Sequence, residues 1–368
     1  MHNTLSVEYK SPSDAWADLS AGTAKGYARD IARAMNITEA ELVAAGVGDN
    51  VIRLEADWGQ LVQELGSLGV VKIITRNEHA VHEKVGLFDK ISSKGPMGIV
   101  LNREIDLRLF LTKWAFGFAV TTENSKGRRK SLQFFDHEGT AIHKIFLTKS
   151  SDETAYEALV SDYKATEQLR ALQLQNYEPA NAPEADNTID IEALKNEWGA
   201  LKDVHQFHGL LRKHNCDRHQ SFRLIGKEFA EKLTPEALKN VLEQSVANKI
   251  SIMVFVGNKG CIQIHTGHIE KVKKMGPWIN ILDPGFNLHL RQDHIAEIWL
   301  VRKPTKDGII TTLGHEQNAI LRELMVCDQL LHLDQIIFAR NDEFEPSLFR
   351  YGKKCQCLTP AAEVFFIS

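Results

Sequence analysis

The second half of the chain contains one segment with helical periodicity and several with strand periodicity. Between Ile191 and Lys213, apolar residues such as Leu194, Trp198 and Leu201 recur at three- and four-residue steps, which predicts an amphipathic helix. Apolar or alternating runs bounded by Gly and Pro predict strands at 250–256, 261–266, 286–291, 295–302 and 308–313. Because the strands follow the helix as a run, the pattern predicts an α+β fold with antiparallel sheets.

The chain also contains an internal repeat. The segment that begins at Arg76 aligns without gaps with the segment that begins at Gly257, 181 positions later. The same spacing pairs Gly95-Pro96 with Gly276-Pro277, Leu107-Arg-Leu109 with Leu288-His-Leu290, Val120 with Val301, and Gly127 with Gly308. Upstream, a spacing of 179 aligns the run from Ala32 with the run from Leu211. We therefore expect tandem duplicated domains, each with N-terminal helices and a large antiparallel β-sheet.

A stretch rich in Pro, Asn and acidic residues separates the two copies. Residues 177–188 contain few large apolar side chains, which is typical of a linker. We expect a first repeat at 20–165, a partly helical segment and linker at 166–194, a second repeat at 195–330, and an atypical C-terminal segment at 331–368.

Composition and charge are those of an ordinary globular protein. The chain is 43% hydrophobic and 25% charged, as is usual for soluble domains. A formal net charge of −4 gives no overall attraction to nucleic acid, so we do not expect a nucleic-acid partner. The basic cluster Arg128–Lys130 is interpreted as a turn or a strand end. No stretch approaches the roughly 20 apolar residues that span a bilayer, and residues 1–10 contain no signal-peptide core, so we expect a cytoplasmic protein without a membrane span.

The five cysteines are scattered and odd in number, which favours free thiols over a disulfide framework. Cys355 and Cys357 are close enough to contribute to a metal site. However, no second Cys or His pair stands nearby at zinc-finger spacing, so coincidence is the simpler interpretation.

Two histidines stand out in the predicted helix. His205 and His208 are three residues apart, which places them on the face that carries Leu194, Trp198 and Leu201. An imidazole beside an apolar surface suits haem, because the macrocycle needs an apolar wall and the iron needs a nitrogen ligand. Hydrogen-bonded histidines at the margin of a core would have the same spacing, so both interpretations stay open.

Basic residues and two similar strands provide further candidates. Haem propionates require Arg or Lys donors, and the second copy offers Arg212, Lys213, Arg218, Arg223, Arg302 and Lys303. In the runs 106–110 and 287–291, alternation places the leucines on one face and Arg108 or His289 on the other. The polar face of such a strand could line a cavity on the side opposite the histidines, or it could simply be exposed to solvent.

Taken together, these segments resemble the HemS-type haem utilisation family of hemin transport proteins and hemin-degrading factors. The second copy carries Asp203-Val-His-Gln-Phe207, Asn258-Lys-Gly-Cys-Ile-Gln-Ile264, Gly276-Pro-Trp278, Phe286-Asn-Leu-His-Leu290 and Arg302-Lys-Pro-Thr-Lys-Asp-Gly308. The first copy carries Asn102-Arg-Glu-Ile-Asp-Leu-Arg-Leu-Phe110. The resemblance covers about residues 20–165 and 195–313.

The resemblance implies two similar halves, with haem (iron protoporphyrin IX) in a cleft on the second half that the first half reaches. It implies that His205 is the proximal ligand of the iron and that His208 is an alternative ligand. Arg108 would be the distal residue and, if the haem is degraded, the catalytic one.

Other haem contacts are also implied by the resemblance. Arg218 and Lys303 fall on the positions that bind the propionates, and His289 on the position of a secondary haem contact. The implied role is haem binding and trafficking in the cytoplasm for iron acquisition, with a haem oxygenase or a haem importer component as partner. Whether the protein is a carrier or a haem-degrading, haem oxygenase-like enzyme stays open. A haem-independent protein interaction module that uses the surface around Arg128 is the alternative.

The sequence departs from the family after Leu313. The first copy continues with Gln133-Phe-Phe-Asp-His-Glu-Gly139, whereas the second continues with Gly314-His-Glu-Gln-Asn-Ala-Ile320, so the expected strand-turn-strand is missing. Residues 347–354, with Tyr351 and Lys354, resemble the family's closing strand only faintly. We therefore expect weaker propionate anchoring than in other members.

Overall fold

The computed structural model describes residues 9–55, 57–124, 127–178, 183–316 and 323–326, and every structural statement below concerns these residues. The helices of the first copy are α1 (Pro12–Ser20), α2 (Ala28–Ala34), α3 (Glu39–Ala44), α4 (Trp58–Glu64) and α5 (Glu153–Asp162). Those of the second copy are α6 (Ile191–Gly199), α7 (Gln206–Lys213), α8 (Arg218–Leu224) and α9 (Glu236–Ala247). Short 3-10 turns are η1 (Leu65–Leu68), η2 (Leu111–Lys113), η3 (Asp186–Thr188) and η4 (Gln292–His294).

The strands form two nine-stranded antiparallel sheets. The first sheet has the order β1 (Val51–Leu54), β7 (Phe116–Asn124), β8 (Gly127–Phe135), β9 (Ala141–Ser151), β2 (Gly69–Arg76), β3 (Ala80–Leu87), β15 (Phe286–Arg291), β14 (Trp278–Asp283), β13 (Val272–Met275). The second has the order β10 (Ala230–Leu233), β16 (Glu297–Thr305), β17 (Gly308–Glu316), β18 (Glu323–Val326), β11 (Ile252–Gly257), β12 (Cys261–Gly267), β6 (Asp106–Phe110), β5 (Met97–Leu101), β4 (Ile91–Lys94). The predicted α+β fold with duplicated antiparallel sheets is confirmed.

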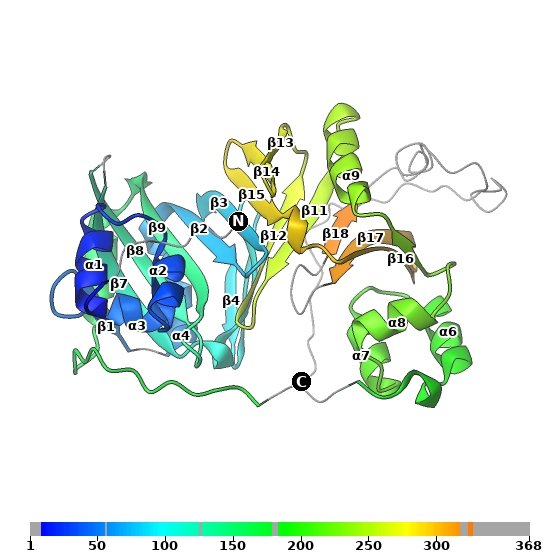
Figure 1. Ribbon diagram of the computed structural model, residues 1–368, viewed down its shortest axis with the longest axis horizontal. Helices are drawn as coiled ribbons and strands as arrows, with labels where there is room; N and C mark the ends of the chain where they lie inside the picture. The colour runs from blue at the N-terminus through cyan, green and yellow to red at the C-terminus, as the bar shows by residue number, and fades with distance from the viewer. Residues whose placement is uncertain (1–8, 56, 125–126, 179–182, 317–322, 327–368) are drawn as a thin grey trace.

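The two copies exchange strands. In the second sheet, β6 of the first copy pairs with β12 of the second, so that Arg108 lies opposite Ile262. In the first sheet, β15 of the second copy pairs with β3 of the first, so that Leu288 lies opposite His82. Each sheet therefore contains six strands of one copy and three of the other (Figure 1).

The sheets pack face to face over part of their area, and helices cover parts of both their facing and their outer sides. One core joins Val71 of the first sheet to Leu107 of the second, together with residues of α4 and α5. A second core joins Val254 of the second sheet to Leu288 of the first, with α9 beside them. The α1–α3 group packs on β1, β7 and β8, and the α6–α8 group packs on β16, as Figure 1 shows.

The helix that the periodicity predicts across 191–213 is interrupted. Helix α6 ends at Gly199, and α7 begins at Gln206. The backbone N–H groups of Lys202 and Asp203 donate to the Gln206 side chain at 2.9 and 3.2 Å. The N–H of His205 donates to Asp203 Oδ1 at 2.8 Å. These side-chain acceptors replace helical carbonyls, so the turn satisfies its backbone while the apolar spacing continues.

The absence of a closing strand after Leu313 is also a wrong prediction. Strand β17 runs on to Glu316, and β18 lies between β17 and β11, with Leu324 opposite both Leu313 and Val254. Pairing on both sides protects two strands that would otherwise leave open edges. Residues 331–368, including Tyr351, Lys354 and Cys355-Gln-Cys357, lie outside the described residues.

Smaller predictions can be compared directly. The basic cluster Arg128–Lys130 lies at the start of β8, as expected for a strand end. Cys216 and Cys261 are free thiols. Among the described helices, none is long and apolar enough to cross a membrane.

Candidate functional site

One side of the second sheet carries an apolar surface that solvent partly reaches. We call it the open face and define it by the partly exposed residues Met97, Ile99, Arg108, Phe110, Met253, Phe255 and Ile262. Strand register places them on one side, because directly opposed residues share a face: Ile99 and Ile262 both oppose Arg108. The opposite side, with Leu107 and Leu109, is buried in the core.

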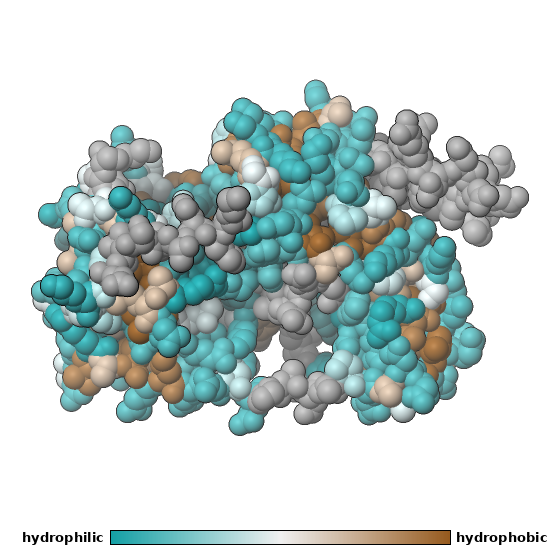
Figure 2. Space-filling view, in the orientation of Figure 1, coloured by the Kyte–Doolittle hydropathy of each residue, from teal (hydrophilic) through white to brown (hydrophobic). Residues whose placement is uncertain are grey.

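The α6–α8 group lies at the β16 end of this same side. Register carries the open face from Met253 through β18 and Thr312 to Val301, and Val301 packs into the core of the helical group. The surface is hollowed between this helical group and the first half of the molecule, as Figure 2 shows. The helical group that contains α7 therefore packs at the β16 end of the sheet side that carries the open face.

His205 stands at the N-terminus of α7, where its side chain is 62% exposed. Its Nδ1 lies 2.6 Å from Asp203 Oδ1. A carboxylate only accepts hydrogen bonds, so the neutral imidazole donates from Nδ1 and keeps its lone pair on Nε2. The hydrogen bond from the backbone N–H of His205 lowers the pKa of Asp203, which keeps the carboxylate ionised. The geometry presents Nε2 as a ligand for an electrophile or a metal.

His208 follows one turn later in α7 and is also exposed. The buried side of α7 is formed instead by Phe207, Leu210 and Leu211. The prediction that both histidines share the face of Leu194, Trp198 and Leu201 is therefore wrong, since those three residues lie in the core of the helical group. Neither histidine is at a core margin, because the turn before α7 changes the phase of the helical pattern.

Arg218 and Lys303 converge on Phe207. The guanidinium of Arg218 lies 5.7 Å from the centre of that ring, and Lys303 Nζ lies 4.6 Å from it. Lys303 is only 2% exposed. Burial, helped by the charge of Arg218, holds the pKa of Lys303 well below its usual range. The two predicted propionate partners thus lie on the same ring of α7. A bound anion there would stabilise the charged form of Lys303.

Arg108 lies on the open face but comes from the first copy. Its Nη1 donates hydrogen bonds to Asp106 Oδ1 and, at 3.2 Å, to the carbonyl of Leu107. Strand exchange is what brings it onto the sheet that carries Lys303. Residues of both copies therefore contribute to one side of one sheet.

His289 lies elsewhere. It occupies the repeat position of Arg108, but on β15 of the first sheet, where Nδ1 is 2.6 Å from Asn280 Oδ1. Burial lowers the pKa of this imidazole. The structure brings Arg218 and Lys303 together on Phe207 of α7, the helix that also carries His208 and that begins directly after His205. Arg108 lies on the second sheet with Lys303 but five strands away from it, and His289 lies on the other sheet.

Two carboxylates escaped the sequence analysis. Asp203 and Asp106 contact the side chains of His205 and Arg108, each from two residues upstream. In a strand, residues i and i+2 point to the same side. Both acids belong to the motifs quoted above, so this spacing could have indicated Asp106. The contact of Asp203 depends on the turn before α7, which the helical periodicity concealed.

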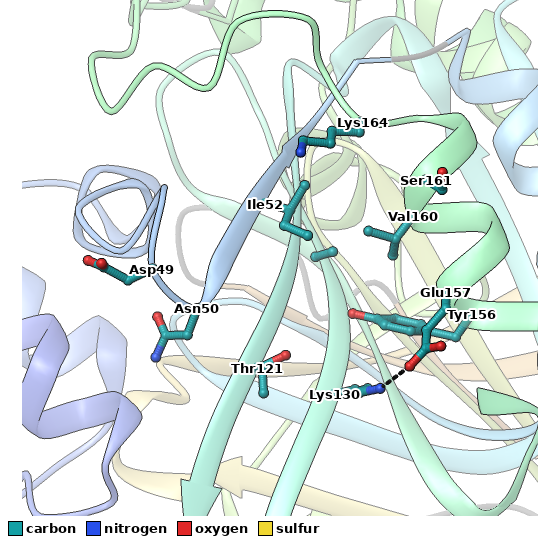
Figure 3. Close-up of a pocket in the computed structure, with 11 residues that line it drawn as sticks. Asp49, Asn50, Ile52, Thr121, Lys130, Tyr156, Glu157, Val160, Ser161 and Lys164 are labelled. Atoms are coloured by element: carbon teal, nitrogen blue, oxygen red, sulfur yellow. Dashed lines mark hydrogen bonds and ion pairs between the residues drawn. The ribbon is translucent and has the colours of Figure 1, made fainter. Parts of the chain in front are cut away.

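A separate cavity of about 410 Å³ lies in the first copy between β1, β7, β8 and α5 (Figure 3). Lys130 points toward α5, where its Nζ is 2.8 Å from Glu157 Oε1. A second carboxylate, Glu153, also pairs with it. None of the predicted site residues lines this cavity, and the charge of Lys130 is matched by acids of α5.

Comparison with known proteins gives consistent matches. The family model of the haemin-degrading HemS.ChuX domain matches residues 36–163 and 215–315. The chain is 46% identical over 289 residues to the hemin transport protein HmuS of Yersinia pestis, which covers 78% of this chain and 83% of the relative. It matches the crystal structure of holo-PhuS, a heme-binding protein from Pseudomonas aeruginosa, with a TM-score of 0.83 and 43% identity, over 87% of this chain and 94% of that one. The heme-degrading enzyme ChuS of Escherichia coli O157:H7 matches with a TM-score of 0.79 and 40% identity, over the same shares.

Proposed function

Since the chain belongs to the haemin-degrading HemS.ChuX domain family, we propose that it binds haem and hands it on in the acquisition of iron. The observation that carries this proposal is His205, whose Nδ1 is held by Asp203 so that Nε2 remains available, in a helical group that packs at the β16 end of the open-face side. Haem iron already has four porphyrin nitrogens, so one such imidazole is a sufficient protein ligand.

Other residues of the site would fit the remaining parts of the haem molecule. The open face offers apolar side chains to the macrocycle, whose removal from water would favour binding. Arg218 and Lys303 would bind the propionates. Lys303 is a buried amine with a lowered pKa, so an incoming carboxylate would raise its affinity for a proton and form a charge-assisted hydrogen bond.

Arg108 would serve the distal side. Its guanidinium would donate hydrogen bonds to whatever ligand occupies the iron opposite His205. His208, one helical turn from His205, would act as an alternative ligand, and His289 would make at most a secondary contact from the other sheet.

Haem degradation is a second candidate function, supported by the position of Arg108 on the open face. Haem would supply the iron that activates oxygen, and Arg108 would be the catalytic residue that orients the distal ligand. To separate carrier from enzyme, the haem complex is given a reductant in the presence of catalase. Loss of the Soret band together with a linear tetrapyrrole would support the enzyme, whereas a stable spectrum would support the carrier.

The site of action that we propose is the cytoplasm, with a haem oxygenase or haem importer component as partner. The name of the relative as a hemin transport protein supports a transport role. The competing hypothesis is a haem-independent interaction module. A pull-down in which His205→Ala protein, prepared without haem, retained its partner would favour that module.

A haem titration followed by absorption spectra tests the proposal. We expect uptake of about one haem per chain with a Soret band, altered by His205→Ala. The matched control is His137→Ala, because His137 belongs to the first copy and contacts the Thr112 carbonyl at 3.3 Å. A featureless titration of the unmodified protein would contradict the proposal.

A further inference from the structure

A carboxylate on the same strand holds the guanidinium of Arg108. Asp106 and Arg108 are two residues apart in β6, so both side chains lie on the open-face side of the second sheet. The Asp106 and Arg108 side chains are only 14% and 19% exposed. Solvent therefore screens this pair less than it would a pair on the surface.

The charge of a second cation, on the first sheet, also affects the pKa of the carboxylate. Burial raises the pKa of Asp106 above its usual value, although the charges of Arg108 and Lys84 act to lower it. Lys84 is itself constrained, because its Nζ lies 3.2 Å from His265 Nδ1, and that ring stacks on Phe286 at 3.7 Å. Asp106 is thus influenced by cations of both neighbouring sheets.

The contact with Asp106 restricts the orientation of the Arg108 guanidinium. A guanidinium has five N–H donors in one rigid plane, at the end of a stem that carries about 2 kcal/mol of rotamer entropy. Asp106 and the Leu107 carbonyl together engage only Nη1. A contact that fixes the plane before a ligand arrives removes part of the entropic cost of using the other donors.

We propose that Asp106 is a positioning residue that orients Arg108 toward the ligand bound to haem iron opposite His205. The inference rests on the proposed function, and it assigns to Asp106 a role in the affinity for that distal ligand. In this proposal Asp106 acts through Arg108 and not through a contact of its own with the haem or its ligand.

The test is azide binding to the ferric haem complex, measured from the absorption spectrum in a double-mutant cycle. Arg108→Ala should weaken azide binding about tenfold in the unmodified protein, because it removes an oriented donor. In the Asp106→Asn background, the same substitution should change azide affinity less than about twofold. Contacting residues whose effects depend on each other show such coupling. Equal effects of Arg108→Ala in both backgrounds would overturn the inference, and so would a larger effect in Asp106→Asn.

The chain provides a matched control. Arg291 and Asp293 form a similar pair two residues apart, with Arg291 Nε 2.7 Å from Asp293 Oδ1, at the end of β15 in the first sheet. Asp293→Asn should leave azide affinity, and its response to Arg108→Ala, unchanged. If Asp293→Asn altered that response as much as Asp106→Asn, the effect would be one of general charge and the inference would fail.

A measurement without haem separates this inference from the proposed function. In the haem-free protein, nitrogen-15 relaxation of the Arg108 Nε–H should give an order parameter of about 0.85, typical of a rigid group. In Asp106→Asn the order parameter should fall below about 0.6. Arg108→Ala assigns the signal. A mobile Arg108 in the unmodified protein would refute the positioning role even if haem bound well. Rigid, Asp106-dependent behaviour without haem uptake would refute the proposed function instead.

Discussion

The two copies have equivalent groups of helices but carry opposite charges at a corresponding position. Helices α1–α3 and α6–α8 correspond at a spacing of 179 residues, and Asn36 and Asn215 share positive φ values of 55° and 49° at the same turn. At this spacing, His205 of the second copy corresponds to Gly26 of the first, and Arg218 corresponds to Glu39. The scaffold is duplicated, but the residues that we propose to bind haem are not.

In the first copy, the charge at this position is neutralised within the protein. Glu39 pairs with Arg76 and, at 2.5 Å, with Lys144. Burial alone would raise the pKa of Glu39, but these two cations lower it to about 2. In the second copy, a cation stands here instead, with buried Lys303 as its neighbour. The first copy thus pairs its buried carboxylate with two cations, whereas the second copy places two cations beside each other, the two residues that we propose to bind the propionates.

The largest effect should come from breaking the charge cluster of the first copy. Glu39→Gln leaves Arg76 and Lys144 partly buried without their carboxylate, so the free energy of unfolding should fall by about 3 kcal/mol. Urea denaturation measures it. Glu157→Gln, which removes an exposed partner of Lys130, should cost less than about 1 kcal/mol. Equal losses of stability in the two variants would show that the buried charge cluster of Glu39 stabilises the fold no more than the ion pair of the exposed Glu157.

The next effect concerns the ligand of the second copy. His205→Ala should alter the ferric spectrum and weaken haem binding about 100-fold, or ~2.8 kcal/mol, with residual ligation through His208. The double substitution should abolish that residual ligation. If His208→Ala changed the Soret position and the affinity while His205→Ala changed neither, the assignment of the two histidines would be reversed.

A smaller effect on haem affinity should distinguish Lys303 of the second sheet from Thr122, the equivalent position of the first sheet. Lys303→Met removes a proposed propionate partner and should weaken haem binding about tenfold, as judged by competition with apomyoglobin. Thr122→Met alters the residue 181 positions earlier in the first copy and should leave haem affinity unchanged. The interpretation fails if both variants bind haem as the unmodified protein does.

The smallest effect is a pH dependence of stability. The folded pKa of Glu39 is about 2 and its ordinary value is 4.5, so the unfolded chain binds the proton more readily. The stabilisation is therefore complete above the ordinary value and is lost as the pH falls toward 2. Between pH 5 and pH 3.5, Glu39 should account for about 1 kcal/mol of lost stability. The difference between unmodified protein and Glu39→Gln should shrink by this amount, and a constant difference would contradict the assignment.

Local patterns were enough to predict much of the architecture. Alternating apolar and polar residues, bounded by Gly and Pro, predicted the strands β11, β12, β15, β16 and β17. Two constant spacings between similar segments indicated the duplication. Motif positions led to His205, Arg108, Arg218 and Lys303. These features depend on side-chain period and on residue identity, both of which are visible along the chain.

Only the tertiary structure decided which strands pair and which side chains meet. Strands β6 and β15 share one pattern, so periodicity cannot say which strand pairs with the second edge of β6, whose first edge pairs with β5 of its own copy and whose second edge pairs with β12 of the other. The turn before α7 depends on hydrogen bonds from Asp203 and Gln206 rather than on apolar spacing. Hydrogen bonds and burial act between residues distant in sequence, and for that reason Arg108 reaches the sheet of Lys303 only in the folded molecule.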